Sequence, residues 1–408
     1  MKNRWLILAL ICLINLCAGS IYSWSVLSAA AAERLTVLTG MPVSAGELAL
    51  AFAIANGIGP VPMILGGALN DRFGPKVTIV SGGVLIGAGL ACCGLLSSVS
   101  AITLCYGLFF GIGLALTYGT CISTAVRLFP ERRGLAGGIV TTAYGMSSVI
   151  LPPVAQWLIG STGIENTFIV LGAVFGGVIV AGGLLTPRPA PALSTAGAPV
   201  EDSSKRPAEM LRSVTFWPML GLLLCGAFPA MMIISQASSV ARAVLACSPA
   251  QAATLVSVLA FSNMLSRLIS GGLSDRFGRL PVLAATLTFA AAGLFLMTLA
   301  APDARLYFVA GIIGVGISFG AFMGIYPGFT ADRFGTRYAS VNYGVMFTGF
   351  ALAGILAPVT MHRLQSAGWS FAQCAWLAIG LCVLGLLLTA VCRVTTQRGK
   401  HNFCNRED

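Results

Sequence analysis

Charged residues are scarce in this sequence of 408 residues, where they make up 9% of the chain against 57% apolar residues. A soluble globular protein carries about 25% charged residues. The scarcity excludes a soluble protein, because its surface would hold too few ionic groups. A spanning helix with its turn takes roughly 20 to 25 residues. The sequence therefore predicts an all-α membrane protein with twelve transmembrane helices and no sizeable soluble domain.

Acidic residues are missing from the interior of every long apolar run, since all 13 lie in loops, at the ends of runs or in the tail. No span offers a carboxylate pair, a metal cluster or a Ser/His pair for catalysis. We therefore expect no enzyme, no metal and no cofactor, and a cation or drug exporter is disfavoured as well. The 12 cysteines lie mostly inside apolar runs without C-x-x-C spacing, which indicates small buried side chains.

The net charge is +11, from 24 Lys and Arg against 13 Asp and Glu. The basic residues lie in short loops between apolar runs, so the expected partner is the anionic face of a lipid bilayer and not a nucleic acid. Most of them lie in loops on the same side as both termini, which predicts that both termini are cytoplasmic. The basic residues that the loops place on the other side are Arg34, Arg242, Arg305 and Arg363.

Polar breaks divide the sequence into twelve apolar runs. They predict an N-terminal six-helix bundle in residues 1–186, a cytoplasmic linker in 187–211, a C-terminal six-helix bundle in 212–392 and a cytoplasmic tail in 393–408. The runs are 5–32, 46–69, 77–99, 101–126, 134–159, 165–186, 212–241, 250–273, 280–301, 304–331, 338–362 and 369–392.

The two halves of the sequence repeat each other. Asp-Arg-Phe-Gly occurs at 71–74 and again at 275–278, a shift of 204 residues that equals half the chain length. The same shift brings the loop at 127–133 onto 331–337. Parallel repeats of this kind predict two bundles related by an axis along the membrane normal, with a binding site between them near the midplane.

These features together resemble the major facilitator superfamily of secondary transporters. The resemblance rests on the repeated Asp-Arg-Phe-Gly loop after spans two and eight, on the twelve spans and on the central linker. It runs the whole length of the chain. It implies the major facilitator fold and transport by rocking of the two halves.

The repeated loops are candidates for conformational gating. Their aspartates can pair with neighbouring arginines and accept hydrogen bonds from helix N-termini, which holds helix ends together in one state only. The alternative is a pair of tight turns, because a glycine ends each motif. The expected gating residues are Asp71, Arg72, Asp275 and Arg276.

Arg267 is the one charged residue deep inside a predicted span. It lies eight residues before Asp275, or roughly 12 Å inside the end of its helix at 1.5 Å rise per residue. A charge at that depth is costly unless it meets a counter-ion or a wet cavity. We expect Arg267 to bind an anionic substrate through its planar fork, with Asn263 one turn earlier on the same face. The alternative is an arginine that snorkels or is satisfied by backbone carbonyls.

Further motifs narrow the resemblance to the oxalate/formate antiporter and monocarboxylate transporter branch. They are Gly19–Ser25, Phe129–Ala136, Asn263-x-x-x-Arg267 and Asn342-Tyr343-Gly344. In that branch the span-eight arginine binds the carboxylate. The oxalate exchanger has a span-eleven lysine where this chain has Phe350, which favours a monocarboxylate over a dianion. Eukaryotic relatives have an acidic residue where this chain has Asn263, so proton coupling is implied by the family alone.

Other side chains are expected to complete the substrate site. Tyr118 matches a substrate-contacting tyrosine of the branch, and Phe322 is its equivalent under the 204-residue shift. We add Phe350, Leu27 and Asn56 as wall residues, because pocket walls are mostly apolar with few polar anchors. Ordinary core or lipid packing stays open for each of them.

The sequence thus favours a proton-coupled transporter of small monocarboxylates of the lactate and pyruvate class, a multi-pass protein of a bacterial inner membrane. An oxalate/formate-type exchanger and a carboxylate receptor that moves nothing stay open as alternatives. The sequence leaves open which monocarboxylate is carried, the direction of flux, the group that carries the proton and the oligomeric state, with a monomer compatible with it.

Overall fold

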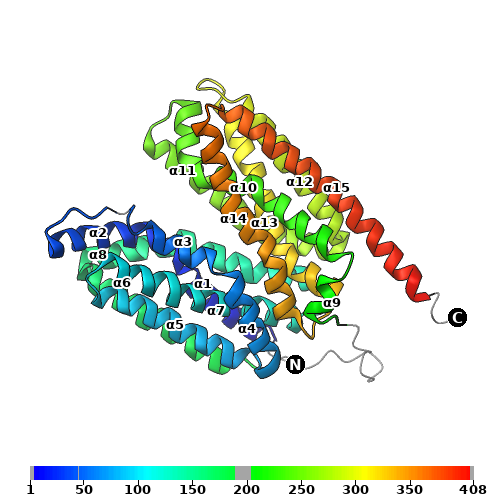
Figure 1. Ribbon diagram of the computed structural model, residues 1–408, viewed down its shortest axis with the longest axis horizontal. Helices are drawn as coiled ribbons and strands as arrows, with labels where there is room; N and C mark the ends of the chain where they lie inside the picture. Colours follow the sequence, from blue (N-terminus) through cyan, green and yellow to red (C-terminus); the bar gives the residue numbers. More distant parts are fainter. Residues whose placement is uncertain (1–3, 45, 189–203, 405–408) are drawn as a thin grey trace. The chain divides into compact units, whose positions relative to one another are not determined.

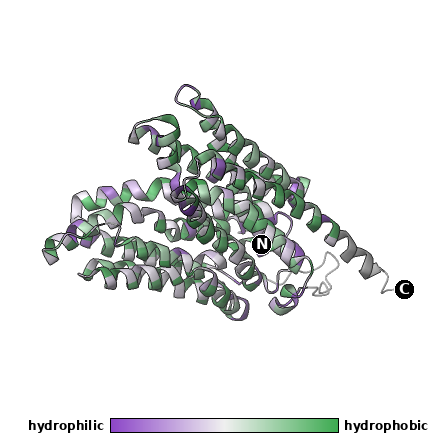
Figure 2. Cartoon of the chain, turned by 45° about the horizontal axis from the view of Figure 1, so that its top comes forward, coloured by the Kyte–Doolittle hydropathy of each residue, from purple (hydrophilic) through white to green (hydrophobic). Residues whose placement is uncertain are grey.

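A computed structural model describes residues 4–44, 46–188 and 204–404 (Figure 1). Within these ranges the chain is almost entirely helical and contains no strand, which confirms the all-α prediction. Most of the predicted linker, residues 189–203, lies outside the described residues, and so does the end of the predicted tail, 405–408. The helices are apolar along most of their length (Figure 2).

The first half of the chain forms helices that are interrupted more often than the apolar runs suggest. The first span has a 3-10 turn in its middle, and the fourth has a stretch of π-helix. The elements are α1 (Arg4–Ala18), η1 (Gly19–Ser23), α2 (Trp24–Thr39), α3 (Ala49–Gly57), α4 (Pro60–Phe73), α5 (Pro75–Leu95), α6 (Val99–Leu104), η2 (Cys105–Phe110), α7 (Gly111–Leu128) and α8 (Arg133–Leu185).

The second half consists mainly of long, continuous helices. A capping box begins α11, where Ser248 and Gln251 exchange side-chain and backbone hydrogen bonds of 3.1 and 3.3 Å. The elements are α9 (Pro207–Leu211), α10 (Phe216–Leu245), α11 (Pro249–Phe277), α12 (Arg279–Thr298), α13 (Arg305–Phe334), α14 (Ala339–Ser366) and α15 (Phe371–Cys404). α9 lies in the predicted linker, and α15 continues into the predicted tail.

Helix α8 joins two predicted spans without a loop. Its 53 residues would reach about 80 Å at 1.5 Å per residue, far more than a ~30 Å hydrocarbon core. Gly163 breaks it with a φ of 78°, a conformation that glycine adopts without strain. Nine other segments, each one helix or a few consecutive helices, are long and apolar enough to span a membrane. Helices α3 and α4 form one further candidate, a pair bent by 43°. Counting both arms of α8, the described residues fit twelve spans.

Contacts divide the chain into two compact units that do not follow the midpoint of the sequence. The first residues of α8 belong with the second half of the chain, and the first residues of α14 belong with the first half. Unit 1 takes its described residues from Met1–Glu131, Val140–Ser204 and Phe334–Val345, and unit 2 from Arg132–Ile139, Lys205–Arg333 and Met346–Asp408.

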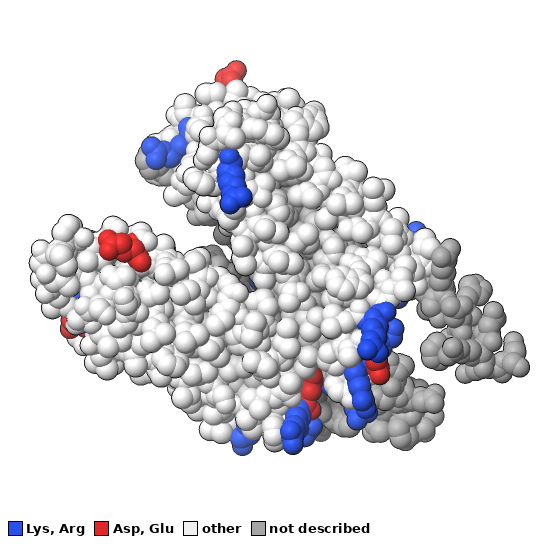
Figure 3. All heavy atoms as spheres, viewed as in Figure 1, with Lys and Arg blue, Asp and Glu red and all other residues white. Residues whose placement is uncertain are grey.

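Close packing in both units depends on glycine. A Cβ at Gly111 would overlap the backbone of Ala55 in unit 1, and a Cβ at Gly311 would overlap the carbonyl oxygen of Gly293 in unit 2. Helices pack this closely in membranes where small residues let the backbones approach. The face shown in Figure 3 is uncharged over most of its area, as expected for a surface in contact with lipid.

Candidate functional site

Arg267 lies in α11, ten residues before the end of that helix. Its residue surface is 2% exposed, so the charge is enclosed and not held at an interface. The Nε of Arg267 donates a hydrogen bond of 3.1 Å to Oδ1 of Asn263, one turn earlier. This hydrogen bond restricts the orientation of the guanidinium group of Arg267.

Two glycine-bearing helices press against the backbone of α11 at this level, and both belong to unit 2. A Cβ at Gly138, near the start of α8, or at Gly324 of α13 would overlap the carbonyl oxygen of Arg267. A Cβ at Gly320 would overlap the carbonyl of Asn263. The segment that carries the arginine is therefore held from two sides by backbone contacts, which positions its side chain.

Two predicted wall residues of unit 2 lie in aromatic clusters. Phe322 of α13 is fully buried, with its ring centroid 5.7 Å from that of Tyr326 and its edge against Gly226 of α10. Phe350 of α14 is half-buried, with its ring 4.6 Å from Phe347 and 6.0 Å from Phe319. Phe350 therefore stands in an aromatic environment.

The predicted site residues of unit 1 differ in exposure. Tyr118 of α7 is 7% exposed, and its ring lies 4.7 Å from Tyr144 of α8. Leu27 of α2 is buried. Asn56 of α3 is exposed and donates to the carbonyl of Phe52 at 3.0 Å. Unit 1 thus holds three of the predicted substrate residues and unit 2 holds the other four, and their joint site stays a prediction.

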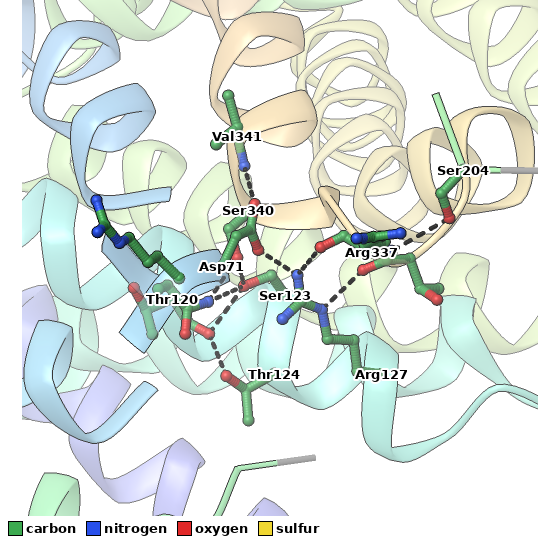
Figure 4. Close-up of polar contacts among 12 residues, drawn as sticks. Asp71, Thr120, Ser123, Thr124, Arg127, Ser204, Arg337, Ser340 and Val341 are labelled. Atoms are coloured by element: carbon green, nitrogen blue, oxygen red, sulfur yellow. Dashed lines mark hydrogen bonds and ion pairs between the residues drawn. The ribbon is translucent and has the colours of Figure 1, made fainter. Parts of the chain in front are cut away.

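The Asp71 loop, residues 70–76, joins α4 to α5 and contacts the start of α14 within unit 1 (Figure 4). Asp71 pairs with Arg127 at the end of α7, and both side chains are largely buried, with 9% and 16% exposed. Arg127 also donates to the carbonyl oxygens of Thr336 at 2.9 Å and Arg337 at 3.1 Å. The N–H of Val341, in the first turn of α14, donates to the other Asp71 oxygen at 3.4 Å.

A neutral triad lies beside this ion pair. The amide of Asn70 donates to the hydroxyl of Ser340 at 2.5 Å, and Ser340 donates to Ser123 at 2.6 Å. All three side chains are at most 2% exposed. A Cβ at Gly67 would overlap the backbone of residues 340 and 341, so the triad forms because glycine lets α4 approach α14 closely.

The Asp275 loop, residues 274–279, makes the related contacts within unit 2. Asp275 accepts hydrogen bonds from the N–H groups of Gly134 at 2.9 Å and Leu135 at 2.7 Å, at the start of α8. It also pairs with Arg279 at 2.6 Å. Asp332 at the end of α13 then bridges Arg279 and Arg133, at 2.9 Å each. A partly exposed network of charges thus holds the start of α8.

The other two predicted gating residues point elsewhere. Arg72 and Arg276 are exposed, and each guanidinium stacks over the next residue, Phe73 at 5.1 Å and Phe277 at 5.4 Å. The ion pairs of the two aspartates are made by Arg127 and Arg279 instead.

Sequence reasoning did not single out the partners that complete these networks. Arg279 could have been considered, because it lies only four residues after Asp275, just beyond the glycine that ends α11. Arg133 and Asp332 are 199 residues apart, and no local pattern joins them. Within the described ranges, no three His, Cys, Asp or Glu side chains lie close enough to hold a metal ion.

Comparison with known proteins gives a family match over most of the chain. A family model described as "Major Facilitator Superfamily" matches residues 5–358. The uncharacterized MFS-type transporter YhjX of Escherichia coli (strain K12) is 27% identical over 356 residues, which are 87% of this chain and 86% of that one.

Two other relatives have named substrates. The oxalate:formate antiporter of Oxalobacter formigenes is 27% identical over 361 residues, covering 86% of this chain and 83% of its own. Monocarboxylate transporter 13 of Bos taurus is 28% identical over 313 residues, covering 74% and 70%. Among solved structures, the Escherichia coli fucose:proton symporter FucP superposes with a TM-score of 0.71 at 13% identity over 96% of this chain and 99% of that one, a likeness of fold.

Proposed function

Because this chain belongs to the major facilitator superfamily, and so is a multi-pass membrane transporter and not an enzyme, we propose that it carries small monocarboxylates. The proposed substrates are anions of the lactate and pyruvate class, moved together with a proton by alternating access. The proposed setting is a bacterial inner membrane with both termini in the cytoplasm, where the positive-inside rule places the basic loops.

Arg267 is the observation that carries this proposal. Arg267 is a residue of α11 that is 2% exposed, and its guanidinium is oriented by a hydrogen bond to Asn263. Arginine keeps its charge and presents two parallel N–H groups that match the two oxygens of a carboxylate. In a membrane protein, an ionisable residue at this depth is by default part of a substrate or ion pathway. The names of two relatives, an oxalate:formate antiporter and a monocarboxylate transporter, also refer to carboxylates.

The environment of Phe350 supports a substrate with a single charge. The rings of Phe347 and Phe319 surround it, so this part of α14 supplies apolar surface. One arginine compensates one carboxylate, whereas the second charge of a dianion would be left in a region of low dielectric. Tyr118, Phe322, Leu27 and Asn56 are proposed as further wall residues.

The two aspartate loops are proposed as the gates of the cycle. Each aspartate holds the first turn of a helix from the other half of the sequence through backbone N–H groups. Breaking these bonds would release the starts of α8 and α14 together, which is the discrete two-state behaviour that alternating access needs.

Uptake of labelled lactate into proteoliposomes tests the function. Uptake by the wild type separates a transporter from a receptor, and stimulation by an inward proton gradient separates symport from exchange. We predict that Arg267→Lys weakens lactate binding about 10- to 100-fold, because one charge-assisted hydrogen bond of the fork is lost. Arg242→Lys, at an exposed arginine in the last turn of α10, is the matched control. Wild-type affinity in Arg267→Lys would refute the carboxylate site.

Exchange of carboxylate anions is the second candidate, because the antiporter relative matches 86% of this chain. We predict that Phe350→Lys improves competition of unlabelled oxalate against labelled lactate by adding a second positive charge. Phe289→Lys, at an exposed phenylalanine of α12, controls for a new lysine elsewhere. If oxalate already competes as well as lactate against the wild type, the chain is an exchanger of the oxalate type.

A further inference from the structure

A cavity of about 550 Å³ opens between the ends of α11, α12, α13 and α15, wholly within unit 2. It is separate from Arg267, which does not line it. We call it the arginine pocket. Its lining combines three arginines and one aspartate with apolar side chains: Arg279, Arg333, Arg393, Asp332, Leu280, Ala284, Phe329, Leu386 and Thr389, among others.

The charges of the arginine pocket do not balance. Both oxygens of Asp332 accept hydrogen bonds, one from Arg133 and one from Arg279. Arg279 is further engaged by Asp275. Among the described side chains, two positive charges, Arg333 and Arg393, are left over once Asp275 and Asp332 have been matched with Arg133 and Arg279. An anion in the pocket would therefore meet a net positive potential.

Arg333 lines the arginine pocket and has unused hydrogen-bonding capacity. Its guanidinium stacks over the ring of Phe329 at 5.6 Å, which holds the plane of the fork. Its Nε is buried and has no hydrogen-bond partner among the described residues. A buried N–H without a partner is costly, and an anionic oxygen would satisfy it.

The neighbouring surface is apolar. A second cavity of about 600 Å³ runs along α11, α12 and α13, lined mainly by Val258, Phe261, Leu265, Ile269, Phe289 and Ile317. Phe277 and Pro281 line both cavities, so the apolar groove meets the arginine pocket at this corner. A ligand that fills both needs an anionic head and a long apolar chain.

We propose that the arginine pocket binds the phosphate of an anionic phospholipid, with one acyl chain along the groove between α11 and α12. Basic pockets between transmembrane helices are suited to such headgroups. The bound phosphate would lie beside Arg279 and Asp332, two members of the network around Asp275. The lipid composition of the bilayer is thereby linked to the loop that holds the start of α8.

Native mass spectrometry of the purified protein tests this, with phosphatidylglycerol and phosphatidylcholine added in equal amounts. The wild type is expected to retain phosphatidylglycerol preferentially. The double variant Arg333→Gln/Arg393→Gln is expected to bind it about 30-fold more weakly, at about fivefold for each arginine. The control Arg242→Gln/Arg363→Gln removes the same charge at exposed positions elsewhere and is expected to bind as the wild type does. Equal retention of both lipids, or an unaffected arginine variant, overturns the proposal.

Three further measurements keep the test decisive if the glutamine variant folds poorly. Ala284→Phe leaves every charge in place but fills the pocket, and it is expected to lose phosphatidylglycerol. Arg333→Lys/Arg393→Lys keeps both charges and is expected to retain it. Inorganic phosphate is the remaining probe. If it displaces phosphatidylglycerol at equal concentration, the pocket takes free phosphate and the assignment to a lipid is wrong.

Discussion

The Asp71 and Asp275 loops have the same Asp-Arg-Phe-Gly sequence and share two contacts and one backbone conformation. In each, the aspartate pairs with an arginine of its own half of the sequence, accepts an N–H bond from the first turn of a helix of the other half, and is followed by a glycine with φ near 90°. Beyond these, they differ. The Asp71 loop continues into a buried neutral triad, and the Asp275 loop continues into a partly exposed network of charges.

The difference arises at positions where the repeat has diverged. Under the 204-residue shift, Arg127 corresponds to Ala331, and Asp332 corresponds to Leu128. Ser340 likewise corresponds to an alanine, at position 136. The motif therefore fixes the aspartate and its contact with a helix start. Residues outside the motif decide whether the neighbouring contacts are neutral and buried or charged and partly exposed.

The largest expected difference between the loops is in the response to loss of the aspartate. Asp71→Ala should lower stability by about 3 kcal/mol, because Arg127 stays largely buried without a carboxylate. Asp275→Ala should lower it by about 1 to 2 kcal/mol, because Arg279 keeps Asp332 while two N–H bonds are lost. Thermal unfolding of the purified variants measures both, with exposed Asp303→Ala as the control. A larger loss for Asp275→Ala would reverse the comparison.

Much of this architecture could be predicted from the sequence, because the hydrocarbon core of a membrane admits few kinds of spanning backbone structure. Apolar runs of fixed length predicted the all-α fold, and glycines such as Gly107 and Gly111 allow the close helix packing that the fold requires. The π-helical stretch η2 carries no such signal, because its residues Cys105–Phe110 are as apolar as the helices around them. The 3-10 turn η1 contains one glycine and two serines, but this composition alone does not tell a turn from a continuous helix.

The part of the candidate site that depends on residue type and local spacing could be predicted from the sequence. Arg267 could be identified because a charge inside an apolar run is energetically costly. Its contact with Asn263 follows from helical spacing. The partners of the two aspartates were harder to find. Whether Asp71 meets Arg72 or Arg127 depends on how α4 and α7 pack, a tertiary property that a motif one helix turn long does not contain.

A smaller effect is expected from the neutral triad of the Asp71 loop. Ser340→Ala should cost about 1 to 2 kcal/mol, because the buried amide of Asn70 and the hydroxyl of Ser123 lose their shared partner. Ser148→Ala removes a hydroxyl that donates only to the carbonyl of Gly145 in its own helix, and it should change stability by less than about 0.5 kcal/mol. Equal losses in the two variants would show that the triad adds nothing to the holding of α14.

The smallest expected effect separates the two loops by their response to salt. Arg133 and Asp332 are 21% and 34% exposed, so a double-mutant cycle with Arg133→Gln and Asp332→Asn should give a coupling of about 0.5 kcal/mol at low salt. At about 1 M salt the screening length falls to about 3 Å, and this coupling should vanish. The matching cycle with Arg127→Gln and Asp71→Asn should keep most of its coupling, because only 16% and 9% of those side chains are exposed. Thermal unfolding at both salt concentrations measures the two cycles. If salt weakens them equally, burial does not distinguish the ion pair of the Asp71 loop from the Arg133–Asp332 pair beside the Asp275 loop.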